Sequence, residues 1–281
     1  MLGKLIKHEF KAVNRLMIPL HLALIVISVI GRFYIQFVGF SEIGSKYLSD
    51  NLWFGILSGS LAGLYILALI AVCIVTQLYL LVLRPRKNLF TDEGYLTHTL
   101  PVTASAHIWS KLIVAFVWSI IDVILIALSV LAMFVNKEFL EAISQIGREL
   151  IASFPDAFGV TPVVGLPLFI VAALLDTISG ILIVYMCLAI GHSFNTHKIL
   201  ASVGIYAGYN VVVSLISSIF VSITGTNTLS RTTAIISYTI TNSAGGYFLG
   251  IMIFSIILGL VVSAAAFVVT GYFMKKRLNL E

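Results

Sequence analysis

Six long runs of apolar residues constrain the fold of this 281-residue chain more than any other feature. Each run is long enough to cross the hydrocarbon core of a bilayer, which needs about 20 helical residues. Only 10% of the residues are charged, whereas soluble domains average about 25%. We therefore expect an all-α membrane protein with six transmembrane helices, near residues 16–38, 52–83, 108–135, 163–190, 199–223 and 247–274.

The Lys and Arg residues indicate how these spans are oriented. Cytoplasmic loops carry an excess of Lys and Arg, and both ends of the chain are basic. With a cytoplasmic N-terminus, only five of the 17 Lys and Arg residues fall outside, namely Arg32, Lys46, Lys137, Arg148 and Arg231. An even number of spans then places the C-terminus on the same side. The sequence predicts a multi-pass membrane protein with both termini in the cytoplasm.

Three further segments have a distinct character. Residues 1–15 place basic residues opposite apolar ones at helical spacing, which predicts an amphipathic interfacial helix rather than a frayed basic tail. Residues 136–160 show the same alternation and predict an amphipathic segment at the outer interface. Residues 224–246 are rich in Ser, Thr, Asn and Gly and predict a short re-entrant or hairpin structure. We treat residues 16–281 as a single six-helix transmembrane domain.

Two carboxylates, Asp122 and Asp176, lie near the middle of the third and fourth apolar runs. A charged residue at the bilayer centre costs about 2.5–3.5 kcal/mol on insertion scales, so such residues are functional candidates by default. A packing role, with the carboxyl protonated or bonded to a neighbouring Ser, Thr or Tyr, explains them equally well. We expect both to face the bundle interior or a dimer cavity.

Glycines repeat every four residues in three of the runs, at Gly55, Gly59 and Gly63, at Gly204 and Gly208, and at Gly246 and Gly250. Small residues at this spacing let helix backbones approach closely, so we expect them to pack helices together.

His192 and His197 lie in a short loop without an accompanying thiolate or carboxylate. We interpret that segment as a solvated loop rather than a metal site.

Motifs for several chemistries are missing from the sequence. There is no glycine-rich phosphate loop ending in Gly-Lys-Ser/Thr, and His8-Glu9 lacks the second His of the helical zinc-protease motif. No Gly-x-Ser-x-Gly nucleophile turn is present. No basic stripe with interleaved aromatics supports nucleic-acid binding. We expect no catalytic site, no metal site and no cofactor on this chain.

The loop from Arg84 to Lys111 is the most distinctive polar segment, and the predicted topology places it in the cytoplasm. Thr91 is a suitable helix cap, and the acidic residues after it complement the positive end of a helix dipole. Pro101 then ends that short helix, and Thr103 is placed to cap the next one. The sequence predicts a short helix across the membrane face, either as a docking surface or as an ordinary amphipathic connector.

The same residues resemble the type-2 ABC transporter permease family, the membrane subunits of many bacterial ABC exporters. The likeness rests on Glu93-Gly94, a short apolar helix from Tyr95 to Leu100, Pro101-Val102-Thr103, and Lys111 opening the third span. The N-terminal segment Leu5-Ile6-Lys7-His8-Glu9-Phe10-Lys11 also looks like the family's amphipathic first helix. The long polar segment between spans three and four departs from some relatives.

The resemblance implies a coupling helix that a separate cytoplasmic ATPase grips. Its contact residues would be Asp92, Glu93, Gly94, Tyr95, Leu96, Leu100 and Pro101. It also implies a bacterial cytoplasmic membrane, ATP and Mg on the partner ATPase, and a second permease chain in a homodimer or heterodimer. The alternatives are a secondary transporter that couples ions through Asp122 and Asp176, and a membrane scaffold that transports nothing.

Overall fold

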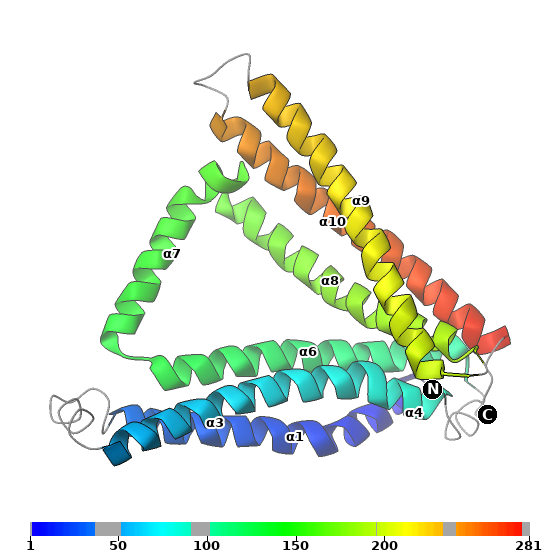
Figure 1. Cartoon of the computed structure of the whole chain (residues 1–281), viewed down its shortest axis with the longest axis horizontal. Helices are drawn as coiled ribbons and strands as arrows, with labels where there is room; N and C mark the ends of the chain where they lie inside the picture. The colour runs from blue at the N-terminus through cyan, green and yellow to red at the C-terminus, as the bar shows by residue number, and fades with distance from the viewer. Residues whose placement is uncertain (1, 37–51, 91–101, 195, 233–239, 277–281) are drawn as a thin grey trace. The chain divides into compact units, whose positions relative to one another are not determined.

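The computed structural model describes residues 2–36, 52–90, 102–194, 196–232 and 240–276, with side chains omitted at 52–54, 58, 224–232, 240–247 and 276 (Figure 1). Helix is the only regular secondary structure within these ranges. The elements are α1 (Leu2–Tyr34), α3 (Leu52–Gln77), the π-helix η2 (Leu78–Leu83), α4 (Arg84–Phe90), α6 (Ala104–Phe134), α7 (Lys137–Phe158), α8 (Pro162–Gly191), α9 (Lys198–Thr232) and α10 (Ile240–Lys276).

Six helical segments of the described chain are long and apolar enough to cross a membrane. They are Leu2–Tyr34, Gly55–Phe90, Ala104–Phe134, Pro162–Gly191, Lys198–Ile223 and Phe248–Lys275. The prediction of an all-α, multi-pass membrane protein with six such helices is thus confirmed. Its orientation in the membrane and the type of membrane remain predictions.

The first helix differs from the prediction because it has no boundary between residues 15 and 16. α1 runs without interruption from Leu2 to Tyr34, and Pro19 lies inside it. Proline removes one backbone hydrogen bond from a helix interior, yet the helix continues past it. Residues 2–15 are therefore the beginning of a longer helix, and their position at a membrane surface remains a prediction.

The second apolar run also extends further than expected. α3 passes into the π-helix η2 and then into α4, which ends at Phe90 rather than near residue 83. The segment Gly55–Phe90 has 36 residues, and at 1.5 Å per residue it is about 54 Å long, against a bilayer core of about 30 Å. Such a helix must tilt or project from the membrane. π-helical turns of this kind are frequent at functional sites.

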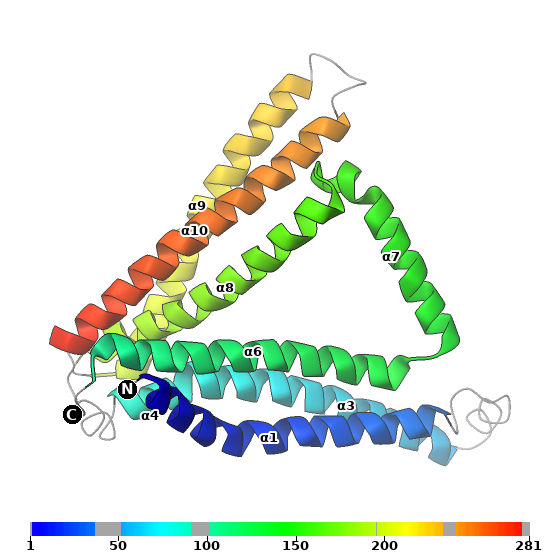
Figure 2. The ribbon, with the colours of Figure 1, turned by 180° about the vertical axis from the view of Figure 1, so that it is seen from behind.

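The chain divides into two compact units. Unit 1 comprises residues 1–84 and 109–141, and unit 2 comprises residues 85–108 and 142–281. In unit 1, α1, α3 and α6 lie side by side (Figures 1 and 2). Their shared core contains Leu24, Tyr65, Val72 and Met133. A Cβ at Gly31 would come within 3.1 Å of the Met133 methyl group, so the small residue lets α1 approach α6.

One face of α1 explains its packing in unit 1. The buried residues of the helix are spaced three or four apart, as helical periodicity requires, and they are Val13, Met17, His21, Leu24, Ser28 and Gly31. Leu22, Ile25, Val26 and Phe33 lie on the other side and are exposed. In a bilayer that exposed apolar face is covered by lipid or protein rather than by water.

In unit 2, α8, α9 and α10 lie together (Figures 1 and 2). Ser179 of α8 donates to the Gly259 carbonyl at 3.1 Å and lies 2.7 Å from the Ser263 hydroxyl, both on α10. Gly191 and Ser202 join the ends of α8 and α9, because a Cβ at Gly191 would lie 2.7 Å from the Ser202 backbone nitrogen. Phe154 and Phe158 of α7 contact Phe169 of α8, and Phe158 also contacts Phe248 of α10.

The glycine repeats and residues 224–246 differ from the sequence predictions. Among the described residues, a Cβ at Gly55, Gly59, Gly63, Gly204, Gly208 or Gly250 would meet no atom within 4 Å, so these glycines do not pack against the described part of the chain. The surroundings of Gly246 lie outside the described part. Residues 224–232 and 240–246 are the ends of α9 and α10 rather than a separate re-entrant element. Residues 233–239 lie outside the described residues. α7 is the helix that was expected within residues 136–160.

Candidate functional site

The predicted ATPase-contact residues all lie within 91–101, outside the described residues. These are Asp92, Glu93, Gly94, Tyr95, Leu96, Leu100 and Pro101. The structure does describe both ends of the loop. α4 ends at Phe90, and α6 begins at Ala104, directly after Thr103, as the predicted cap requires. The Thr103 carbonyl accepts from the Ala106 backbone nitrogen at 2.9 Å.

A single carboxylate, Glu9 of α1, binds both basic residues that delimit this loop. Arg84 Nε donates to Glu9 Oε2 at 3.2 Å, and Lys111 Nζ donates to Glu9 Oε1 at 2.6 Å. The Lys111 side chain is only 4% exposed and that of Glu9 12% exposed. Hydrogen bonds between ionised groups are roughly twice as strong as those between neutral groups. Glu9 therefore fixes the first turns of α1 to the helices on both sides of the loop.

The sequence did not predict this role of Glu9, which entered only in a failed zinc motif and in the N-terminal segment that resembles the family's first helix. A usable signal was present. Glu9 is the only acidic residue among the first 41 positions, and it lies on the same helical face as Val13 and Met17. A lone carboxylate on a packing face needs a cationic partner from another element.

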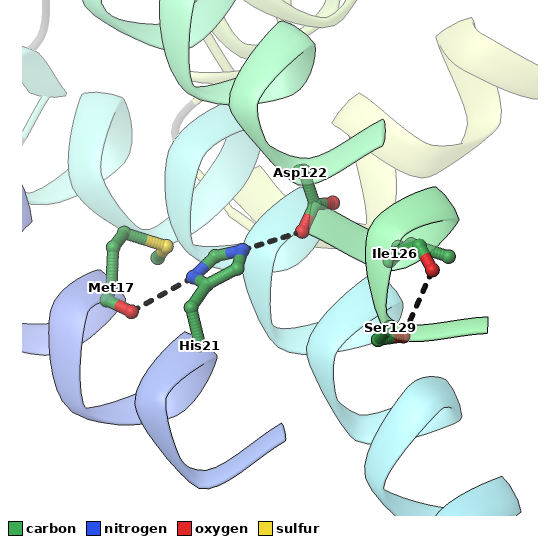
Figure 3. Close-up of polar contacts among 5 residues, drawn as sticks. All are labelled: Met17, His21, Asp122, Ile126 and Ser129. Atoms are coloured by element: carbon green, nitrogen blue, oxygen red, sulfur yellow. Dashed lines mark hydrogen bonds and ion pairs between the residues drawn. The ribbon is translucent and has the colours of Figure 1, made fainter. Parts of the chain in front are cut away.

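Asp122 of α6 is buried and bonded to His21 of α1 (Figure 3). His21 Nε2 lies 2.8 Å from Asp122 Oδ1, and His21 Nδ1 lies 2.8 Å from the Met17 carbonyl oxygen. The side chains are 4% and 6% exposed. The Trp118 ring packs beside the imidazole, with ring centroids 5.5 Å apart. Asp122 thus faces the interior of unit 1, and its partner is a histidine rather than the expected Ser, Thr or Tyr.

The geometry of His21 determines how protons are shared in this pair. A carbonyl oxygen only accepts, so Nδ1 must donate to Met17. One more proton must then lie between Nε2 and Asp122 Oδ1 for that contact to be a hydrogen bond. The pair is either neutral imidazole with a protonated carboxyl or imidazolium with a carboxylate. In both forms its total charge is zero, which is compatible with burial in a bilayer.

A second polar contact joins α3 to α6 within unit 1. The Tyr65 hydroxyl lies 3.1 Å from the Ser129 hydroxyl. The Ser129 hydroxyl donates to the Ile126 carbonyl at 2.8 Å (Figure 3). Both groups are buried. The helices of unit 1 are therefore connected by hydrogen bonds at three levels, through Glu9, through His21 and through Tyr65.

Asp176 has a different environment in unit 2. Its side chain is exposed in a cleft between α8, α9 and α10 with a volume of about 390 Å³. In the part of the chain that the structure describes, it makes no hydrogen bond or ion pair. The cleft is lined by Asp176, Ser179, Gly180, Ile183, Tyr206, Tyr209, Asn210, Val213, Ser255, Leu258, Gly259 and Val262. The sequence identified Asp176 but none of its neighbours on α9 and α10.

His192 corrects the expectation of a solvated loop. It is buried at the end of α8, its Nδ1 lies 2.8 Å from the Leu188 carbonyl oxygen, and its ring stacks on Phe90 at 5.1 Å. Burial lowers the pKa of His192 below its ordinary value, and the positive charges of Arg86 and Lys198 act in the same direction. Among the described residues, no three His, Cys, Asp or Glu side chains gather in an arrangement that would hold a metal.

Comparison with known proteins identifies no relative of the chain. No family model, no curated protein and no solved structure matches the chain. The functional inferences below therefore rest on the residues and their geometry.

Proposed function

We propose that the chain is the permease subunit of an ABC exporter and pairs with a separate cytoplasmic ATPase. The observation that supports this most is the Glu9 contact with Arg84 and Lys111, at the two ends of the predicted coupling loop. A motor that pulls on a loop moves a membrane domain only if the loop's ends are rigidly joined to its helices. Glu9 provides such a junction, since packed helices move as bodies.

The rest of the mechanism follows from the proposed topology. The helix within residues 92–100 would dock on the ATPase, whose nucleotide-driven closure would displace it. The displacement would reach α4 and α6 directly and α1 through Glu9. Two permease chains would form one path, and ATP and Mg would be bound by the ATPase. We place the protein in a bacterial cytoplasmic membrane with both termini inside.

Recovery of the ATPase with the tagged chain tests this proposal. The double variant Glu93→Ala with Leu96→Asp should lose ATPase co-purification while the chain still accumulates in membranes. A matched control is Glu138→Ala with Leu140→Asp on α7, where both side chains are exposed and the predicted location is outside the cell. ATPase recovery that is unchanged in the first variant, or equally lost in the control, contradicts the proposal.

One observation favours a second candidate, a secondary transporter coupled to protons. The buried His21–Asp122 pair holds a proton between two titratable groups within the membrane-spanning helices. Intramembrane pairs of this kind occur in proton relays. Transport in vesicles distinguishes the two candidates. A permease of the ABC class stops when ATP is depleted, whereas a proton-coupled carrier stops when the proton gradient is collapsed.

A further inference from the structure

The cleft around Asp176 is built from matching faces of three helices. Each helix contributes residues at positions i, i+3, i+4 and i+7, which form one continuous face of a helix. On α8 these are residues 176, 179, 180 and 183, on α9 residues 206, 209, 210 and 213, and on α10 residues 255, 258, 259 and 262. Three regular faces therefore converge on one groove.

Asp176 contributes nothing to holding the three helices together. The connection between α8 and α10 is made one turn away by Ser179, which bonds to Gly259 and Ser263. The Asn210 amide donates to the Tyr206 carbonyl at 2.8 Å and is thus also engaged within its own helix. A carboxylate at this depth costs about 2.5–3.5 kcal/mol unless a partner compensates it. The described residues of unit 2 do not supply such a partner.

A second copy of the chain is poorly suited to supply that partner. Asp176 is the 15th of the 30 residues of α8, so it lies near the middle of the span. No Lys or Arg occurs in residues 52–83, 112–136, 149–197 or 199–230. In α1 no Lys or Arg occurs between Arg15 and Arg32, and Arg148 lies in α7, which is not one of the six long apolar helices. A cation that reaches Asp176 is therefore a ligand rather than a residue of a neighbouring permease chain.

The remaining lining indicates what kind of cation fits. The rings of Tyr206 and Tyr209 lie on the same face of α9, and tyrosine faces attract organic cations. Ile183, Val213, Leu258 and Val262 provide apolar walls. A volume of about 390 Å³ falls within the roughly 300–1,000 Å³ of small-molecule sites. We propose that this cleft binds a lipophilic organic cation, whose charge pairs with Asp176 and whose apolar groups contact the tyrosines and aliphatic side chains.

This inference deepens the proposed function by naming a substrate class, and it rests on that function only for the claim that the bound cation is transported. Binding is tested on the full chain in lipid nanodiscs without any ATPase. The probes are tetraphenylphosphonium and tetraphenylborate, ions of similar size and opposite charge, and binding to empty nanodiscs is subtracted. The wild type should bind the cation and exclude the anion.

Variants locate the site. Asp176→Asn should weaken tetraphenylphosphonium binding about tenfold or more, the scale expected when a charged pair loses one partner. Tyr206→Phe should retain binding because the ring remains, whereas Tyr206→Leu should weaken it. Thr177→Val is the control, because the Thr177 hydroxyl donates to the Ala173 carbonyl within α8 and does not line the cleft.

Three results would overturn the inference. These are equal binding of both ions by the wild type, unchanged cation binding by Asp176→Asn, and an equal loss with Thr177→Val. Failure of the proposed function is a separate outcome, because it appears as an absent ATPase while cation binding persists. If instead the ATPase co-purifies but the cation does not bind, only the substrate class is wrong.

Discussion

The two units use polar groups in opposite ways. In unit 1 the polar side chains are buried and bonded across helices, as with Glu9 and Lys111 or His21 and Asp122. In unit 2 the helices are joined by small residues, a serine and aromatic rings, and Asp176 is left exposed. Two aspartates near mid-span thus have different physical roles. Asp122 is buried and bonded to a neighbouring helix, whereas Asp176 is exposed in a cleft.

Replacing each aspartate by asparagine should give the largest difference in stability change between the two units. Asp122→Asn removes the charge and the shared proton of a buried pair, and breaking such a pair costs about 3–5 kcal/mol. Asp176→Asn breaks no hydrogen bond or ion pair among the described residues and removes a charge that is costly within a bilayer, so it should not destabilise the chain. Unfolding by SDS in mixed micelles measures the change in stability of both variants. Equal shifts in the two variants would remove the contrast between the units.

A double variant sharpens this comparison. His21→Leu with Asp122→Leu replaces the pair by apolar side chains, a change that is often neutral or stabilising for buried ion pairs. The double variant should therefore be more stable than Asp122→Asn alone. If it is less stable, the pair contributes more than the cost of leaving one partner unpaired.

Removing the charge of Glu9 should give the next largest loss of stability. Glu9→Gln keeps the shape of the side chain but removes its charge, and hydrogen bonds to charged groups contribute about 1.5–3 kcal/mol. Under the proposed function this variant should also retain the ATPase while losing ATP-driven transport. Glu138→Gln, on the exposed surface of α7, is the control and should change neither property. A stable Glu9→Gln chain with normal transport would show that the contact is dispensable.

Disturbing the close packing of unit 2 should reduce stability by a comparable or smaller amount. In Gly191→Ala the new Cβ would lie 2.7 Å from the backbone nitrogen of Ser202 and 2.8 Å from its Cα, so α8 and α9 must separate. Overpacking of this kind costs about 1–3 kcal/mol. Gly208→Ala on α9 meets open space and serves as the control. If both alanines are tolerated equally, the ends of these helices are not tightly packed.

The smallest expected effect is the pH dependence of the α8–α9 corner. The pKa of His192 is lowered by burial, so between that value and the ordinary 6.5 the unfolded chain binds more protons than the folded one. The stability that neutral His192 contributes is therefore present above pH 6.5 and is lost as the pH falls through the lowered pKa. The protection factors for hydrogen exchange at Leu188 and Gly191 should therefore fall on acidification. His192→Gln should remove that fall, and protection factors that do not change with pH in the wild type would contradict the prediction.

The sequence predicted the helices well because hydropathy over about 20 residues is a strong and local signal. It failed where a structure depends on residues far apart in the chain. His21 is 101 positions from Asp122, and nothing in the local sequence of either residue indicates that they are partners. The glycine repeats misled for the same reason, because spacing shows which residues share a face but not what that face meets. The predicted boundary after residue 15 was wrong because a change in composition does not require a break in the helix.

The central claim is that the loop between α4 and α6 receives force from a nucleotide-hydrolysing partner. A photo-crosslinking residue at position 96, in cells that express the full chain, tests it most directly. We expect a single main adduct with a cytoplasmic ATPase, formed from position 96 and not from position 140 on α7. Crosslinks only to lipid, or labelling of position 96 by an impermeant reagent added outside the cell, would contradict it.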